Sequence, residues 1–172
     1  IAVAYSLSGR GWQIHLALTG YFCLIRIPCS GVYLNWACVM HSESAVVFIT
    51  GAGKRVGAAF ARSLHQHGYR IALHYRQAKA EAQSVANALN ALRPDSCLLL
   101  QADLSMSAER DALIPQIIGH YGQLDVLINN ASSFSPTPIG SASDAHWDDL
   151  FNSNARAPLF LSQAAAPYLR KQ

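Results

Sequence analysis

The sequence predicts an α/β fold in which helices cover both faces of a parallel, doubly wound sheet. Three observations lead to this prediction: short apolar runs alternate with stretches of helical periodicity, the first clear run leads into a glycine-rich turn, and a later run ends in polar residues. Continuous apolar runs are typical of strands buried on both faces of a parallel sheet. At 172 residues, the chain has the length of one domain.

Composition and charge favour a folded protein and exclude several kinds of partner. Hydrophobic residues make up 51% of the chain and charged residues 13%, which supports a packed core and argues against disorder. The net charge of +3 comes without a basic run, so we expect no binding to nucleic acid. The cysteine spacings match neither a CxxC pair nor a zinc pattern, and we expect free thiols in a reducing, cytoplasmic compartment and no metal site. The cysteines are Cys23, Cys29, Cys38 and Cys97.

Residues 1–39 differ in character from the rest of the chain. Their aromatic residues follow neither a helical nor a strand period, and the chain does not open with Met. The apolar run at residues 14–25 is too short to span a bilayer, so we expect no membrane association. A targeting segment is the alternative, although no typical cleavage site follows. We predict that the native domain begins at Met40. Residues 1–39 would then be a non-native or disordered extension, and residues 40–172 the front, cofactor-binding part of one domain.

A strand, a glycine-rich turn, a helix and a second strand follow one another from residue 45. Residues 45–49 form an apolar, largely β-branched run, and the glycine-rich stretch occupies residues 50–57. Apolar residues then recur at helical spacing as far as His67, with Gly68 in the position of a helix C-cap. Residues 71–75 form the second strand. Such a unit of about thirty residues is the context that a dinucleotide fingerprint requires; the alternative is a tight turn without a ligand.

The glycine turn suits the binding of a diphosphate. Gly51 permits a tight exit from the strand and the close approach of a ligand. The helix N-terminus beyond it offers unpaired N–H groups and a partial positive charge. Gly57 lets the helix pack closely on the sheet. We therefore predict a Rossmann-type nucleotide site at this turn.

The end of the second strand indicates which dinucleotide would bind. An Asp or Glu about 20 residues after the glycine turn would bind the ribose hydroxyls of NAD. The residues at this point are His74, Tyr75, Arg76 and Gln77, and none is a carboxylate. The Arg76 guanidinium can instead make a forked contact with a 2′-phosphate; the alternative is a solvated arginine beside a strand end. The sequence favours NADP (NADPH) as the cofactor.

The rest of the chain continues the alternation of helices and strands. We expect helices at residues 81–92 and 107–121, strands at residues 97–101 and 124–130, and a last helix that begins at Ser143 or Asp144. Pro115 is expected to kink the helix that contains it. The prediction is thus a Rossmann-type sheet truncated after about four strands. Ligands on such sheets bind beyond the carboxyl ends of the strands, at the switch point.

Several of these residues resemble the short-chain dehydrogenase/reductase family in order and spacing. They are Thr50, Gly51 and Gly57 of the turn, Asp103-Leu104, Asn129-Asn130-Ala131, and Asn154. Two segments are similar to the pteridine reductases within that family: residues 50–57, where Arg55 stands in place of the more usual middle glycine, and residues 130–138 (Asn-Ala-Ser-Ser-Phe-Ser-Pro-Thr-Pro). The resemblance extends from Val46 to Leu169.

The resemblance implies a cofactor-binding role for many of the matching positions. These are Gly51, Lys54, Arg55, Val56, Gly57, His74, Tyr75, Arg76, Gln77, Asp103, Leu104, Asn130, Ala131 and Ser132. Within that set, Arg76 and Gln77 would meet the 2′-phosphate, while Asp103 and Leu104 would flank the adenine.

The resemblance also implies substrate contacts at Arg55, Ser132 and Phe134. Phe134 would stack on a pterin ring, because a flat heteroaromatic gains from offset stacking on an aromatic side chain; the alternative is a core or loop phenylalanine. Asn154 would mark a helix distortion that supports the catalytic proton relay, whereas the alternative is an ordinary polar helix residue.

The family's proton donor is the Tyr of a Tyr-x-x-x-Lys pair, in which the Lys lowers the Tyr pKa. Tyr75 and Lys79 have this spacing, but they follow the second strand, near the expected adenosine, and we do not assign them to catalysis. The catalytic helix is expected beyond Gln172, so we expect this chain alone to be inactive. We also expect its fourth strand to form an unpaired edge.

The complete protein is expected to use NADPH to reduce a pterin or dihydrofolate, and to form a homo-tetramer as relatives commonly do. Two alternatives stay open. One is another short-chain carbonyl reductase, such as a 3-oxoacyl-carrier reductase, although an acyl chain does not require an aromatic platform. The other is a non-catalytic dinucleotide-binding module, because fold does not determine function.

Overall fold

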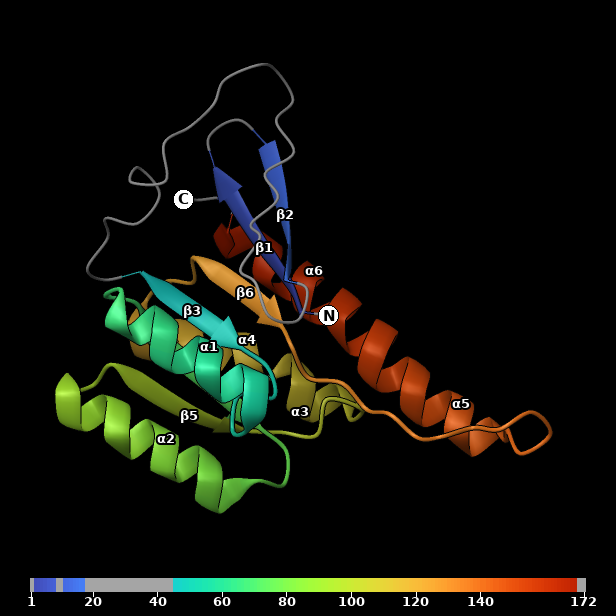
Figure 1. Cartoon of the computed structure of the whole chain (residues 1–172). Helices are drawn as coiled ribbons and strands as arrows, with labels where there is room; N and C mark the ends of the chain where they lie inside the picture. The colour runs from blue at the N-terminus through green and yellow to red at the C-terminus, as the bar shows by residue number, and fades with distance from the viewer. Residues whose placement is uncertain (1, 9–10, 18–44, 170–172) are drawn as a thin grey trace.

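The computed structural model describes residues 2–8, 11–17 and 45–169, which form a six-stranded sheet with helices on both faces (Figure 1). The order across the sheet is β2-β1-β6-β3-β4-β5. The strands are β1 (Ala2–Ser8), β2 (Gly11–Ala17), β3 (Val46–Ile49), β4 (Arg70–Tyr75), β5 (Cys97–Gln101) and β6 (Val126–Asn129). The helices are α1 (Arg55–Gln66), α2 (Lys79–Leu92), α3 (Ser107–Asp111), α4 (Leu113–Tyr121), α5 (Asp144–Phe151), the π-helix η2 (Asn152–Arg156) and α6 (Ala157–Leu169).

The predicted α/β fold is confirmed in the part of the sheet from β5 to β6. β3 pairs in parallel with β4 and with β6, and β4 pairs in parallel with β5. The reversal of strand order occurs at β3, because the chain adds β4 and β5 on one side of it and β6 on the other. The carboxyl ends of β3 and β6 therefore lie side by side, at the switch point where such sheets bind ligands.

Alternate residues of β3 supply two separate hydrophobic cores. Val47 and Ile49 pack with residues of α1 and α2, whereas Val46 and Phe48 pack with residues of α4 and α6. Figure 1 shows α1 and α2 on one face of the sheet. Because successive side chains of a strand point to opposite faces, a strand covered on both sides must be apolar throughout. The continuous apolar run at residues 45–49 is explained in this way.

The predicted helix at residues 107–121 is divided in two. α3 ends at Asp111 and α4 begins at Leu113, with Ala112 between them. Pro115 explains the break, because its ring clashes with the carbonyl of the residue four positions earlier, Asp111, and it donates no N–H. The start expected for the last helix is confirmed: Ser143 is the N-cap of α5, and its hydroxyl accepts a hydrogen bond from the His146 N–H.

The N-terminal segment contains two strands that its sequence pattern did not predict. β1 pairs antiparallel with β2 over residues 2–8 and 11–17, and it also pairs antiparallel with β6. The expectation that β6 forms an unpaired edge is therefore wrong. An edge strand offers a row of backbone N–H and C=O groups, and a hairpin can pair with these groups without any particular side-chain pattern.

Other expectations for the N-terminal segment lie outside the described residues. These are the start at Met40, most of the apolar run and three of the cysteines. Cys97, which is described, is a buried free thiol. None of the helices in the described ranges combines the length and apolar character needed to cross a bilayer.

Candidate functional site

The glycine turn after β3 is held against the end of β6 by close backbone packing. Gly51 has φ +63°, and a Cβ added there would lie 2.9 Å from Ala131 Cα. A Cβ on Gly57 would lie 2.5 Å from the Gly51 carbonyl oxygen. Both positions therefore require glycine, and Gly57 packs the first turn of α1 against the glycine turn and the Asn130 side chain. At Gly51, the atoms that leave no room for a side chain all belong to Ala131.

Thr50 and Asn130 connect the ends of β3 and β6 through their side chains. The Thr50 hydroxyl accepts the N–H groups of Asn130 and Ala131, each at 2.9 Å. The Asn130 amide donates to the carbonyl oxygens of Thr50 at 2.9 Å and Gly51 at 3.1 Å. The side chain of Asn130 thus supports the turn, and the cofactor-binding role that the resemblance implies for this residue stays a prediction. Sequence reasoning did not predict that the Thr50 hydroxyl connects the two strand ends. The only signal in the sequence was that Thr50 directly precedes the first glycine of the turn.

His74 supports the turn from the strand on the other side of β3. Its Nδ1 accepts the Gly51 N–H at 3.1 Å, so Nε2 carries the proton and donates to the Ala102 carbonyl at 3.0 Å. The ring is 2% exposed, and burial lowers the His74 pKa, although the Ala102 hydrogen bond and the Asp103 charge oppose that shift. The neutral ring is thus required, because a protonated one could not accept from Gly51.

Three of the residues predicted to bind the cofactor have buried side chains. His74 lies beneath the turn and acts on it through Gly51. Tyr75 is 5% exposed and its hydroxyl donates to Gln101, and Leu104 packs in the core formed with α4 and α6. Helices cover both faces of β4, so His74 and Tyr75, which point to opposite faces, are both buried. A direct contact of these three residues with the cofactor stays a prediction.

The N-terminus of α1 presents an open site for an anion. Lys54 is the N-cap, its side chain makes no capping hydrogen bond, and the first turn of this twelve-residue helix contains no acidic residue. The unpaired N–H groups and the helix dipole at this end favour negative charge. The exposed side chain of Val56 also lies in this first turn. The residues present therefore fit a diphosphate group.

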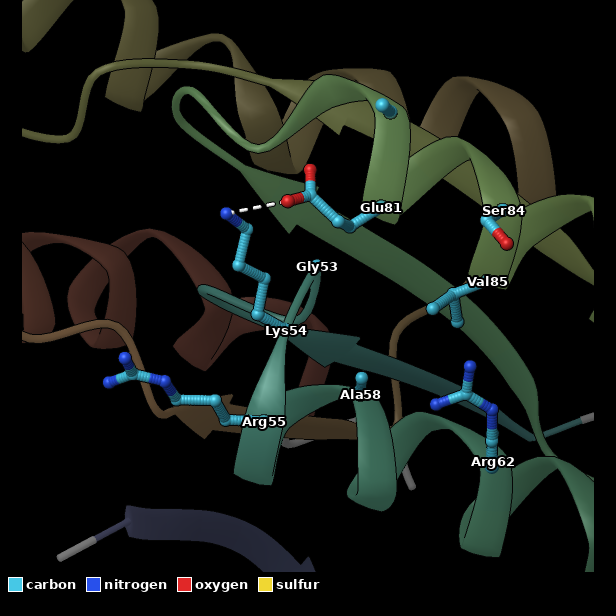
Figure 2. Close-up of a pocket in the computed structure, with 9 residues that line it drawn as sticks. Gly53, Lys54, Arg55, Ala58, Arg62, Glu81, Ser84 and Val85 are labelled. Carbon is cyan, nitrogen blue, oxygen red and sulfur yellow. Dashed lines mark ion pairs between the residues drawn. The ribbon is translucent and has the colours of Figure 1, made fainter.

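Arg55 holds a backbone conformation that normally favours glycine. Its φ is +50°, at the position where the family pattern has the middle glycine. A non-glycine residue in the left-handed region carries about 1 to 2 kcal/mol of strain, and such strain clusters at functional sites. The guanidinium, which is exposed at the helix N-terminus, points away from α2 (Figure 2).

Two cations border the open turn, and each has a carboxylate partner. Lys54 Nζ lies 2.7 Å from Glu81 Oε1, across a shallow cavity of about 500 Å³ between α1 and α2 (Figure 2). Arg76 Nη1 lies 4.0 Å from Asp103 Oδ2. The hydrogen bond from Lys54 lowers the Glu81 pKa. The Asp103 pKa is lowered mainly by its hydrogen bonds from Ser105, and Arg76 adds to that shift. Of the residues predicted to surround the adenosine, Arg76 and Asp103 are thus brought together, and Gln77 is exposed beside them.

The segment after β6 is clamped to the helix that follows it. Asn154 Oδ1 accepts the Ser133 N–H at 3.1 Å, and Asn154 Nδ2 donates to the Ser133 carbonyl at 3.0 Å. The Ser133 hydroxyl also donates to the Asp149 carbonyl at 3.2 Å. Asn154 lies in η2, so the predicted helix distortion at this residue is confirmed. Its side chain holds the loop that carries Ser132 and Phe134, whereas its part in a proton relay stays a prediction.

Phe134 does not belong to either core. Its side chain is 85% exposed, and Ser132 is exposed as well. The loop and α5 project away from the sheet (Figure 1). On α5, the rings of Trp147 and Phe151 stack at 4.6 Å with an interplanar angle of 17°, and both side chains are exposed. Sequence reasoning did not assign a role to either of these two residues. Phe134 is thus not a core residue, whereas the alternative of a loop phenylalanine without a ligand stays open. Phe134, Trp147 and Phe151 are all exposed aromatic side chains.

Comparison with known proteins gives a consistent family signal. The profile described as short chain dehydrogenase matches residues 45–172. Pteridine reductase 1 of Leishmania tarentolae is 40% identical over 152 residues, which cover 70% of this chain and 53% of that protein. The 3-oxoacyl-[acyl-carrier-protein] reductase FabG of Staphylococcus aureus is 30% identical over 131 residues, which cover 76% of this chain and 52% of that protein. The chain thus spans about half the length of the curated relatives that it matches.

Proposed function

Since the chain belongs to the short chain dehydrogenase family, we propose that the complete protein is an oxidoreductase that uses NADPH to reduce a C=N bond of a pterin or dihydrofolate. The observation that carries this proposal is the exposed ring of Phe134, in the loop after β6 that Asn154 holds through the backbone of Ser133. The strand end is in turn tied to the glycine turn through Thr50. An aromatic platform and an anion site thus share one edge of the sheet.

The residues of the turn would hold the cofactor by their backbone and by their charges. The α1 N-terminus would bind the diphosphate, Arg55 would lie at its edge, and Lys54 and Arg76 would bind the 2′-phosphate. When bound, NADPH supplies a hydride, and the protein positions it. The absence of a carboxylate among the four residues after residue 73 supports NADPH over NADH as the cofactor.

Phe134 and Ser132 would select the substrate. A pterin is flat and heteroaromatic, so one of its faces can stack on the Phe134 ring, an arrangement worth about 0.5 to 1.5 kcal/mol beyond area burial. Ser132 is exposed two residues before Phe134 and can hydrogen-bond to the polar edge of such a ring. The 40% identity to the Leishmania protein named pteridine reductase 1 supports the same substrate class.

The test is a steady-state assay of NADPH oxidation by the complete protein, with dihydrobiopterin or dihydrofolate against acetoacetyl thioester. We expect activity on the pterin, and a KM about tenfold higher in Phe134→Ala, because stacking is lost. Phe134→Tyr keeps the ring and serves as the matched control. Activity on the thioester alone would end the pterin proposal.

The second candidate is a carbonyl reductase that acts on an acyl thioester. The 30% identity to the Staphylococcus FabG protein favours it, and the same assay decides between the two. A third outcome, NADPH binding without turnover of either substrate, would identify a dinucleotide-binding module.

We further propose that the complete protein is a cytoplasmic homo-tetramer. Large apolar side chains exposed along α5 and α6 support self-association: Trp147, Phe151, Leu159 and Phe160. Light scattering coupled to size-exclusion chromatography measures the assembly, and a monomer at micromolar concentration would contradict it.

A further inference from the structure

The Lys54–Glu81 ion pair lies at the mouth of the site in which the proposed function places NADPH. Glu81 belongs to the first turn of α2, and its carboxylate reaches across to Lys54 at the N-cap of α1 (Figure 2). Lys54 follows β3 and Arg76 follows β4, and these two strands are paired neighbours. The two cations therefore lie at the same edge of the sheet, where a 2′-phosphate would meet both.

We propose that Glu81 is a specificity-determining residue: it competes with the 2′-phosphate of NADPH for Lys54, and so weakens the preference for NADPH over NADH. The inference rests on the proposed cofactor function and concerns a residue that the family resemblance did not select. A 2′-phosphate carries about two negative charges, and NADH lacks this group. Any effect of Glu81 on that charge therefore falls on NADPH alone.

The exposure of the pair makes such competition feasible. The side chains of Lys54 and Glu81 are 53% and 51% exposed, so water and salt screen their attraction. Lys54 can therefore leave Glu81 and bind another anion. An incoming phosphate offers Lys54 a stronger acceptor, but the carboxylate then stands close to a group of like charge. The Arg76–Asp103 pair is looser, at 4.0 Å, and leaves its guanidinium more available.

A purely structural role for Glu81 predicts a different result. An acidic residue in the first turn of a helix stabilises that helix through its dipole, and removal of Glu81 would then lower stability without changing the choice of cofactor. Asp144 provides the matched control, because it is also a first-turn carboxylate, on α5, and no ion pair involves it among the described residues. Asp144→Asn removes the same charge from the first turn of another helix, α5, which lies away from the glycine turn (Figure 1).

The experiment is a fluorescence titration of the 172-residue chain with NADPH and with NADH at low salt. In Glu81→Gln we expect the Kd for NADPH to fall roughly three- to tenfold, and the Kd for NADH to change less than twofold. The gain should shrink at high salt, because ions screen exposed charges. Asp144→Asn should leave both values unchanged.

A second variant tests whether Glu81 acts through Lys54. Lys54→Gln should weaken NADPH binding about tenfold, and the gain from Glu81→Gln should largely disappear in that background. An equal change for both cofactors, no change, or a gain of full size without Lys54 would each overturn the inference. Failure of every variant to bind NADPH would instead contradict the proposed cofactor function itself.

Discussion

The glycine turn and the loop after β6 border the same edge of the sheet, yet they are built in opposite ways. In the turn, Gly51 and Gly57 are packed against backbone atoms, and buried polar groups of Thr50 and His74 bind the chain. In the loop, Phe134 is exposed and the chain is attached through Ser133. The turn is therefore a scaffold that tolerates little change, whereas the loop can vary its surface without loss of the fold.

This difference has a physical cause. A buried polar group left without a partner costs about 1 to 3 kcal/mol, and a side chain forced into packed backbone costs a similar amount. Exposed loop side chains have water as an alternative partner, so their replacement costs little. Substitutions in the two regions should consequently separate stability from substrate choice.

The largest effect is expected at Gly57. An added Cβ would lie 2.5 Å from the Gly51 carbonyl oxygen and 2.6 Å from Asn130 Nδ2, so Gly57→Ala should destabilise the fold by about 3 kcal/mol. Gly119→Ala is the control, since no atom lies within 4 Å of its added Cβ in α4, and it should stabilise by about 0.5 to 1 kcal/mol. Urea unfolding measures both. Equal effects of the two substitutions would show that the turn is not packed as described.

His74 should come next. His74→Leu leaves the Gly51 N–H and the Ala102 carbonyl without their partner and should cost about 2 kcal/mol, whereas His74→Gln keeps one acceptor and one donor and should cost less. Because burial lowers the His74 pKa below its unfolded value near 6.5, the unfolded state binds the extra proton.

The sign of the pH dependence follows from that shift. The contribution of His74 to stability is complete above about pH 6.5 and is lost as the pH falls toward its lowered folded pKa. Unfolding free energies measured between about pH 7.5 and 5 should therefore decline more steeply in the wild type than in His74→Gln. Parallel curves would mean that His74 does not titrate in this way. His65, whose pKa burial also lowers, is unchanged in both proteins and cancels in the comparison.

Arg55 should show a smaller effect of opposite sign. Arg55→Gly removes the strain at φ +50° and should stabilise by about 0.5 to 1 kcal/mol, but it should weaken NADPH binding about tenfold by removing a cation. Asp95→Gly relieves a similar φ of +56° far from the turn, and it should leave NADPH affinity unchanged. Thermal unfolding and NADPH titration separate the two quantities. A loss of stability in Arg55→Gly would contradict the assignment of strain.

The smallest effect on stability is expected at Phe134. With 85% of its surface exposed, Phe134→Ala should change the unfolding free energy by less than about 0.5 kcal/mol. The same variant is expected to lose pterin affinity in the assay of the complete protein. A large loss of stability would show that the loop is packed as tightly as the turn. It would contradict the claim that the loop tolerates substitution better than the turn does.

The local elements could be predicted because their signals are local. The apolar run of β3, the turn with Gly51 and the helix N-terminus after it follow from residues within one short stretch. The distortion at Asn154 was instead implied by the family resemblance, and the structure shows it as the π-helix η2. The pairing of β1 with β6 could not be predicted, because it rests on backbone groups that carry no sequence pattern.

By itself, the sequence determined the alternation of strands and helices, the glycine positions and the absence of a carboxylate after β4. Only the tertiary structure decided which residues at the strand ends reach solvent: His74 and Leu104 turned inward, while Arg76 and Phe134 stayed exposed. It also placed Glu81 against Lys54. The reason is that hydrophobic periodicity indicates which positions of a helix or strand are buried. The packing of distant elements decides which atoms bury them, and which side chains remain exposed to bind a ligand.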